Sequence, residues 1–366
     1  MEQLKTRKFA GIDLGEEACA LSIYDEGSGE MEEERFPLPS GEPDYIRTGL
    51  DMVMKYFESN QLGWDDFQEV RFAMKDPTPD KRELLDQCLG QDFHNLHQTG
   101  VITRFRAFVE YFFHQERAVW DRNALLLDFS EGRLSGIFVE QIRRARQKAY
   151  RAVQSRIDTG DIKLNRDNPE LDIQFCKLVK QFLVRHPAYI IYLTGDGFEG
   201  DWMKKTLNYL CAGRRVFLGQ NLFANGACLL GIGPVPLMEE GMILMQGDYM
   251  VRHTIGVISQ EAGRTRYVPI ASIGKEWFNT GGSIDIIMDR SQKVDFFYHN
   301  SMENEMECAS CEIKDIPRRP AKTTRLHIKV DFTSETSGVI LITDMGFGTM
   351  FPATGKVTVF PFRLIS

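Results

Sequence analysis

Phe9-Ala-Gly-Ile-Asp13-Leu-Gly15 is an apolar run that ends in an aspartate and a glycine. The alternating segment Ala18-Cys-Ala-Leu-Ser-Ile-Tyr24 follows it directly. An apolar run, a short turn and an alternating run together predict a β-hairpin. We therefore expect residues 9–24 to form a hairpin whose turn carries Asp13 and Gly15.

The same device occurs a second time. Ala124-Leu-Leu-Leu127 runs into Asp128-Phe-Ser-Glu-Gly132, and the alternating residues 134–140 complete a second hairpin. A repeated unit predicts two similar halves facing a cleft. There, Gly-rich turns would present N–H groups to a phosphate chain, and the two aspartates would hold its divalent cation. The alternative is that each aspartate only caps its own turn.

Further segments of the N-terminal half alternate between strand and helix patterns. Tyr189-Ile-Ile-Tyr-Leu-Thr-Gly195-Asp-Gly197 is a buried strand ending in a Gly-rich turn, and residues 202–211 continue as a helix. A strand, a glycine-rich turn and a helix are the order that a ligand at a helix N-terminus requires. Small residues at 224–227 lie in another helix, and the alternation predicts an α/β fold.

The order of these elements resembles that of the superfamily of actin, sugar kinases and the 70-kDa heat-shock chaperones. Residues 11–15 resemble its first phosphate motif, 127–132 the second, 193–198 the adenosine motif and 224–227 the helix after it. The resemblance implies a two-lobed actin-like (ribonuclease H-like) α/β core over residues 1–235, with Asp13 and Asp128 as metal ligands if Mg-nucleotide binds. The implied nucleotide-binding residues are Asp13, Gly15, Glu16, Asp128, Ser130, Gly132, Gly195, Asp196 and Gly197.

This sequence also departs from the chaperone pattern. Glu16 and Glu17 stand where the chaperones place small hydroxyl or amide residues, and each close carboxylate would repel a polyphosphate by about 1 kcal/mol even in water. Ser130 and Glu131 replace two glycines whose backbone freedom lets N–H groups approach phosphate. Residues 102–107 lack the acid of the chaperones' Glu-Pro connection, and Glu110 is only a remote substitute. We therefore expect no resident cofactor, with ATP and Mg²⁺ as the alternative.

The C-terminal third has a different character. Short alternating segments separated by turn residues predict an antiparallel β-sandwich over residues 240–366. Ile316-Pro317-Arg-Arg-Pro320 and the strands after it resemble the end of the chaperones' substrate-binding β-domain, without their helical lid. Thr343-Asp344-Met-Gly346-Phe-Gly348 reads as a turn with no catalytic role. The expected strands are residues 251–258, 265–270, 283–288, 293–298, 307–313, 325–332 and 338–343.

Composition limits the partners and the location. The net charge of −8 argues against a nucleic-acid partner, which needs a basic face. The densest basic run, residues 143–151, has the spacing of a solvated helix face. Seven cysteines without a disulfide rhythm, no signal peptide and no long apolar segment predict a cytoplasmic protein without membrane insertion. The lone Cys308-Ala-Ser-Cys311 is expected to be a coincidence on a strand, because no further ligand accompanies it.

These observations predict a chaperone-like or scaffold protein that binds a polypeptide partner, by strand addition to the β-domain, and barely hydrolyses nucleotide. No catalytic residue is assigned, and the oligomeric state stays open. The alternative is a Mg-ATP-dependent ATPase or chaperone of the same superfamily.

Overall fold

Both predicted hairpins are present, and the first of them begins a mixed five-stranded sheet. The first strand pairs antiparallel with the second and parallel with the fourth. The fifth strand extends the parallel side, and the third extends the antiparallel side. In spatial order the strands are β3 (Glu30–Pro37), β2 (Ala18–Asp25), β1 (Lys8–Leu14), β4 (Phe67–Met74) and β5 (Gln98–Thr103).

The second hairpin begins a sheet with the same arrangement. Its central strand pairs antiparallel with the next strand along the chain and parallel with the strand beyond the following helix. In spatial order the strands are β10 (Arg215–Leu218), β9 (Ile190–Thr194), β6 (Ala124–Ser130), β7 (Arg133–Arg144), β8 (Gln147–Arg156) and β11 (Ile243–Gln246). From β8 to β10 this order repeats that of the first sheet. The two-lobed actin-like core expected from the sequence is confirmed by this duplication.

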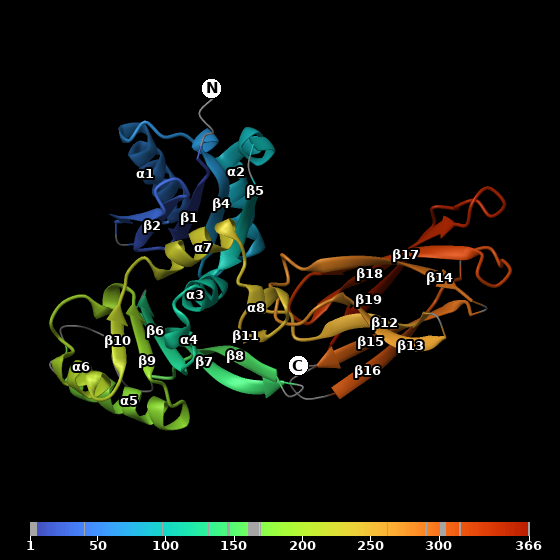
Figure 1. Ribbon diagram of the computed structural model, residues 1–366. Helices are drawn as coiled ribbons and strands as arrows, with labels where there is room; N and C mark the ends of the chain where they lie inside the picture. Colours follow the sequence, from blue (N-terminus) through green and yellow to red (C-terminus); the bar gives the residue numbers. More distant parts are fainter. Residues whose placement is uncertain are drawn as a thin grey trace. The chain divides into compact units, whose positions relative to one another are not determined.

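Helices cover the two sheets and separate them (Figure 1). On the first sheet, α1 buries Leu50, Val53 and Phe57 at helical spacing, which gives it one apolar face. Between the sheets, α7 packs on β1 so closely that a Cβ on Gly11 would lie 2.0 Å from the carbonyl oxygen of Ala224. The helices are α1 (Tyr45–Ser59), α2 (Pro79–Leu96), α3 (Arg104–Phe113), α4 (Arg117–Trp120), α5 (Leu171–Arg185), α6 (Lys204–Cys211), α7 (Leu222–Ile232) and α8 (Pro236–Glu239), with 3₁₀ turns η1 (Trp64–Asp66) and η2 (Asp196–Phe198).

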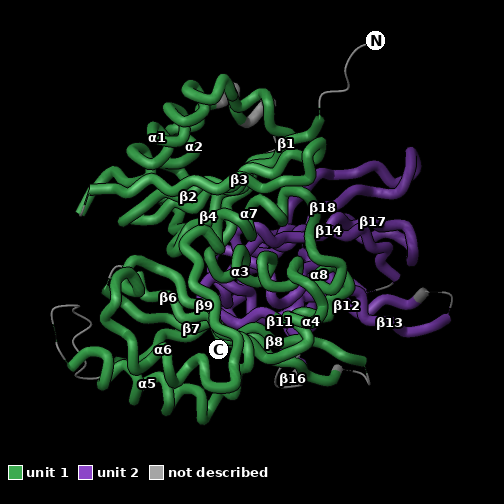
Figure 2. Tube along the Cα trace, turned by 60° about the vertical axis from the view of Figure 1, so that its left-hand side comes forward, with its two compact units in different colours: residues 1–244 green, residues 245–366 purple. Residues whose placement is uncertain are grey.

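The chain separates into two compact units, Met1–Leu244 and Met245–Ser366 (Figure 2). The computed structural model describes residues 6–364 except 40, 97, 131, 145–146, 160–167, 169, 262, 290, 301–304 and 315. Within these residues, no helix combines the length and the apolar character that crossing a membrane requires.

The second unit is built from antiparallel strands in two four-stranded sheets. Side chains from both sheets, among them Phe296, Ile328 and Ile340, form one buried core, so the predicted sandwich is confirmed. One sheet contains β13 (Arg264–Ala271), β12 (Thr254–Glu261), β15 (Lys293–Asn300) and β16 (Glu305–Glu312); the other contains β14 (Gly281–Met288), β17 (Thr324–Phe332), β18 (Ser337–Gly346) and β19 (Val357–Arg363).

Two sequence predictions are wrong. The basic run lies on the β7–β8 hairpin rather than on a helix, because Arg143 pairs with Lys148 across the strands. Asp344 lies within strand β18 with no exposed surface, so it is not an ordinary turn residue. The two cysteines lie on strand β16, as predicted, where Cys308 is exposed and Cys311 is buried because residues three apart on a strand face opposite sides.

Candidate functional site

The turns after the central strands of both lobes meet at a small pocket in the first unit. The carboxyl ends of β1, β6 and β9 supply its walls, because parallel neighbours end at the same edge of a sheet. The structure therefore brings together residues that are far apart in the sequence. Six of the residues predicted from the sequence line this pocket: Asp13, Gly15, Glu16, Ser130, Gly195 and Asp196.

The other three predicted residues lie outside the pocket lining. Asp128 is buried, and its Oδ1 accepts a 2.5 Å hydrogen bond from the Ser130 hydroxyl. Gly132 has a φ of 66° in the turn between β6 and β7, where an added Cβ would meet no atom within 4 Å. A Cβ on Gly197 would lie 2.2 Å from the Phe129 ring. The two glycines are thus explained by turn geometry and close packing.

Arg104 is the residue that sequence reasoning missed. It is the first residue of α3, and its Nε donates a 2.7 Å hydrogen bond to Oδ1 of Asp13. The side chains are only 10% and 6% exposed, which makes this a buried ion pair. A Cβ on Gly15 would lie 2.3 Å from Nη2 of Arg104. The guanidinium therefore lies against the turn in which the resemblance places a phosphate.

The charges around Asp13 have opposing effects. Burial raises the pKa of the Asp13 carboxyl, the Arg104 guanidinium opposes this rise, and the negative charge of Asp128 adds to it. Arg104 also lies over the Phe223 ring, 5.1 Å from its centroid, which adds a cation–π contact.

A glutamine fixes the opposite wall. The Gly195 N–H donates to Oε1 of Gln220 at 3.2 Å, and Nε2 of Gln220 donates to the Gly195 carbonyl at 3.4 Å. The Gln220 carbonyl in turn accepts a 3.2 Å hydrogen bond from Nη1 of Arg35. The backbone N–H and carbonyl of Gly195, in the motif that resembles an adenosine site, are therefore bonded to the protein itself.

The acidic residues singled out from the sequence have different surroundings. Glu16 keeps half of its side chain exposed at the pocket rim, with one oxygen 3.9 Å from Nζ of Lys81. Glu131 lies outside the described residues. Glu110 does not replace the missing acid of the chaperone pattern, because its buried carboxylate pairs with Arg106 and accepts a hydrogen bond from the Val235 N–H. It links α3 to the segment after α7.

The free space in the pocket is about 20 Å³. One ordered water needs roughly 10–15 Å³, whereas ligand sites usually offer roughly 300 Å³ or more. A divalent cation on Asp13 would lie beside the Arg104 guanidinium, so these donors do not fit Mg²⁺ in this arrangement. In the described part of the chain, no group of three or more His, Cys, Asp or Glu side chains could hold a metal ion.

The duplicated sheets and the facing acidic turns define a protein of the actin-like fold class. Residues 44–246, more than half of the chain, match the family described as "Family of unknown function (DUF5716) C-terminal", and the chain belongs to this family. Residues 250–364 match the "Domain of unknown function (DUF8552)". No protein with a curated description matches the chain.

Several solved structures are similar over about three fifths of the chain. The activator of the 2-hydroxyisocaproyl-CoA dehydratase from Clostridium difficile is 11% identical, with a TM-score of 0.41 over 61% of this chain and 94% of its own. The (R)-2-hydroxyglutaryl-CoA dehydratase component A from Acidaminococcus fermentans is 11% identical, with a TM-score of 0.40 over 62% and 98%. A ROK hexokinase from Thermus thermophilus is 12% identical, with a TM-score of 0.35 over 62% and 98%. Since these TM-scores lie below 0.5, we take neither ligand nor activity from these proteins.

Proposed function

We propose that this chain is a chaperone-like or scaffold protein that does not hydrolyse nucleotide. Its first unit keeps an actin-like core whose cleft is closed to Mg-nucleotide by its own arginine, and its second unit binds a polypeptide. The order of a nucleotide-type core followed by a β-sandwich is the order of the heat-shock chaperones that the sequence resembles. The observation that carries the proposal is the buried Arg104–Asp13 ion pair.

The ion pair disfavours a bound nucleotide for an energetic reason. Arg104 already supplies the positive charge that Mg²⁺ would bring to Asp13, in the place where a phosphate would lie. A ligand would have to separate the pair, and leaving one buried charge without its partner costs about 3–5 kcal/mol. That cost lowers an affinity by about two to three and a half orders of magnitude. A site whose Kd for Mg-nucleotide would otherwise be about 100 μM would then have a Kd of about 10 mM or more, which leaves it mostly empty at millimolar nucleotide.

Calorimetry and thermal unfolding of the full chain test the first part of the proposal. We expect neither heat of binding nor a rise in melting temperature with millimolar Mg-ATP or Mg-ADP, because only a ligand that binds the native state raises it. Magnesium alone and ATP alone serve as controls. A rise that grows with Mg-ATP concentration would favour the alternative, an ATPase of the same superfamily.

The polypeptide partner is tested separately. A reduced and carboxymethylated protein, which stays unfolded in buffer, should bind the full chain in a fluorescence anisotropy titration. The binding should be the same with and without Mg-ATP, since the cleft does not take part. If neither this probe nor extended peptides bind, the role proposed for the second unit is wrong.

A further inference from the structure

A cavity of about 390 Å³ opens at one end of the sandwich in the second unit. It lies where β14 and β16 end and where β15 and β17 begin. Its apolar part is formed by Met288, Ile313 and Ile316, of which the two isoleucines are 2% and 9% exposed. The volume falls within the range of roughly 300–1,000 Å³ that is usual for ligand sites.

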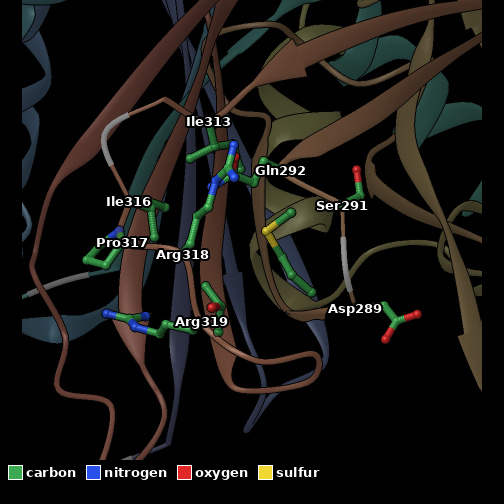
Figure 3. Close-up of a pocket in the computed structure, with 10 residues that line it drawn as sticks. Asp289, Ser291, Gln292, Ile313, Ile316, Pro317, Arg318 and Arg319 are labelled. Carbon is green, nitrogen blue, oxygen red and sulfur yellow. The ribbon is translucent and has the colours of Figure 1, made fainter.

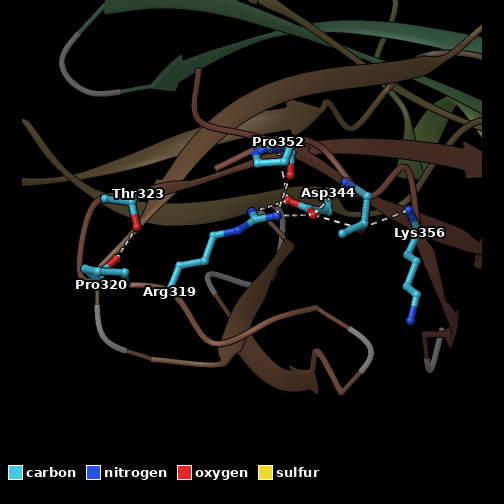
Figure 4. A network of polar contacts seen from close by, with 8 residues as sticks. Arg319, Pro320, Thr323, Asp344, Pro352 and Lys356 are labelled. Atoms are coloured by element: carbon cyan, nitrogen blue, oxygen red, sulfur yellow. Dashed lines mark hydrogen bonds and ion pairs between the residues drawn. The ribbon is translucent and has the colours of Figure 1, made fainter. Parts of the chain in front are cut away.

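Two adjacent arginines line this cavity, and the second of them belongs to the fold. Nη1 and Nη2 of Arg319 donate to the two carboxylate oxygens of Asp344 at 2.7 and 2.8 Å, and Nη2 also donates to the Pro352 carbonyl at 2.8 Å (Figure 4). Asp344 has no exposed surface and also accepts a 2.8 Å hydrogen bond from the Thr354 hydroxyl. This network fixes the backbone of the segment that carries both arginines.

Arg318 is the cation that the fold does not use. Its side chain extends toward Ile313 and Gln292, whereas that of Arg319 points away (Figure 3). Among the residues that the structure describes, no carboxylate forms an ion pair with Arg318. A guanidinium binds a carboxylate through two parallel hydrogen bonds. A guanidinium held on a fixed segment beside an apolar wall therefore suits a carboxylate that has an apolar group next to it.

The charge of the ligand is limited by a carboxylate at the rim. Asp289 also lines the cavity and is exposed, so it repels a ligand with two negative charges more strongly than a ligand with one. One guanidinium balances a single negative charge. The cavity therefore favours a carboxylate over a phosphate.

The strand edges of the second unit leave little room for an added strand. Pro269 on the edge strand β13 and Pro361 on the edge strand β19 remove backbone donors. The edge strand β16 carries glutamates at both ends and in between, a charge pattern that discourages pairing. β14 approaches β13 so closely that a Cβ on Gly282 would lie 1.7 Å from the Ile270 carbonyl oxygen. The second unit is therefore better suited to bind the end of a polypeptide than to bind an extended polypeptide along a sheet edge.

We propose that this cavity binds the C-terminal carboxylate of a polypeptide whose last residue is apolar, with Arg318 as the carboxylate ligand. The inference rests on the proposed role of the second unit in binding a polypeptide. The apolar last side chain packs against Ile313 and Ile316, and Gln292 offers an amide to the peptide backbone.

Anisotropy titrations of the full chain with labelled, acetylated hexapeptides test the proposal. Peptides ending in Leu, Val or Phe with a free carboxylate should bind, and the matched C-terminal amides should bind about tenfold to a hundredfold more weakly, because a hydrogen bond to a charged group is lost. Arg318→Gln should cause a similar loss, Arg318→Lys a smaller one, and Arg363→Gln, which removes an exposed arginine elsewhere in the unit, none.

The proposal is overturned if the amides bind as well as the acids, if Arg318→Gln binds like the original protein, or if none of the peptides binds. Competition by isovalerate at the affinity of the peptides would assign the cavity to free carboxylic acids, and competition by inorganic phosphate to phosphate; either result also overturns it. Binding of the carboxymethylated protein that persists in Arg318→Gln would refute this site alone and leave the proposed function intact.

Discussion

The ion pair between Arg104 and Asp13 makes a quantitative prediction about stability. Arg104→Met leaves the buried Asp13 carboxylate without the cation bonded to it, and Asp13→Asn leaves the Arg104 guanidinium without its bonded anion. Both side chains are at least nine-tenths buried and joined at 2.7 Å, so each single change should lower the free energy of unfolding by about 3–5 kcal/mol. The double variant leaves no unpaired charge and should lose less than the sum of the two.

The free energy of unfolding is measured by urea unfolding of the original protein, the two single variants and the double variant, each as the full chain. We expect a coupling energy of about 1.5–3 kcal/mol between the two positions, the upper part of the range for groups in direct contact. The matched control is Arg7 with Glu26, an ion pair whose side chains are 57% and 44% exposed and whose changes should be additive. If the losses of free energy of unfolding at Arg104 and Asp13 are additive, the reasoning is refuted, because the arginine then does not stabilise the ionised aspartate.

Three further predictions concern both units. Burial opposes ionisation of the Asp344 carboxyl, but the hydrogen bonds that it accepts, first of all those from Arg319, outweigh this effect and lower its pKa. On acidification, Asp344 is therefore protonated at a higher pH in the unfolded chain than in the folded chain. Between about pH 4 and pH 3 the contribution of Asp344 to the free energy of unfolding should fall by up to about 1.4 kcal/mol per pH unit. Asp344→Asn should reduce the pH dependence by this contribution in urea unfolding followed by isoleucine methyl NMR, and an unchanged slope would contradict the assignment. Gly195→Ala should lower the free energy of unfolding in urea by about 1–3 kcal/mol, because the φ of Gly195 is 99° and the new Cβ would lie 2.4 Å from a carbonyl oxygen. The control is Gly132→Ala, whose new Cβ meets only open space and which should lower it less. Equal losses would disprove the close contact at Gly195. The double change Glu16→Thr and Glu17→Thr should not create calorimetric Mg-ATP binding while Arg104 stays in place, and binding in that variant would show that the glutamates alone exclude nucleotide.

Much of the core was predictable because its strands are apolar runs with turn residues at their ends. The two hairpins that carry Asp13 and Asp128 are local structures, and their repetition revealed the two lobes. Strand β19 was missed because Pro361 interrupts its alternation, and an edge strand tolerates a proline that a central strand does not. The hydrophobic pattern of a short segment therefore predicts strands and hairpins, because these depend on residues that are close together in the sequence.

Long-range pairing was not predictable. Arg104 and Asp13 are 91 residues apart, and only the packing of α3 on the cleft brings them together. The one signal in the sequence was the arginine in a segment where the chaperones carry an acid. Arg319 and Asp344 likewise belong to separate segments, so the buried network of the second unit could not be read from either. The basic hairpin was mistaken for a helix because its apolar residues repeat at intervals of three and four, which cross-strand pairing overrides.

A crystal structure determined after growth with millimolar magnesium and ATP tests the central claim most directly. The account predicts that the Arg104 guanidinium stays bonded to Asp13, with Nε near 2.7 Å from Oδ1, and that no phosphate density lies between residues 13–17 and 128–132. Phosphates bound to those turns, with Mg²⁺ on Asp13 and the guanidinium displaced, would contradict it.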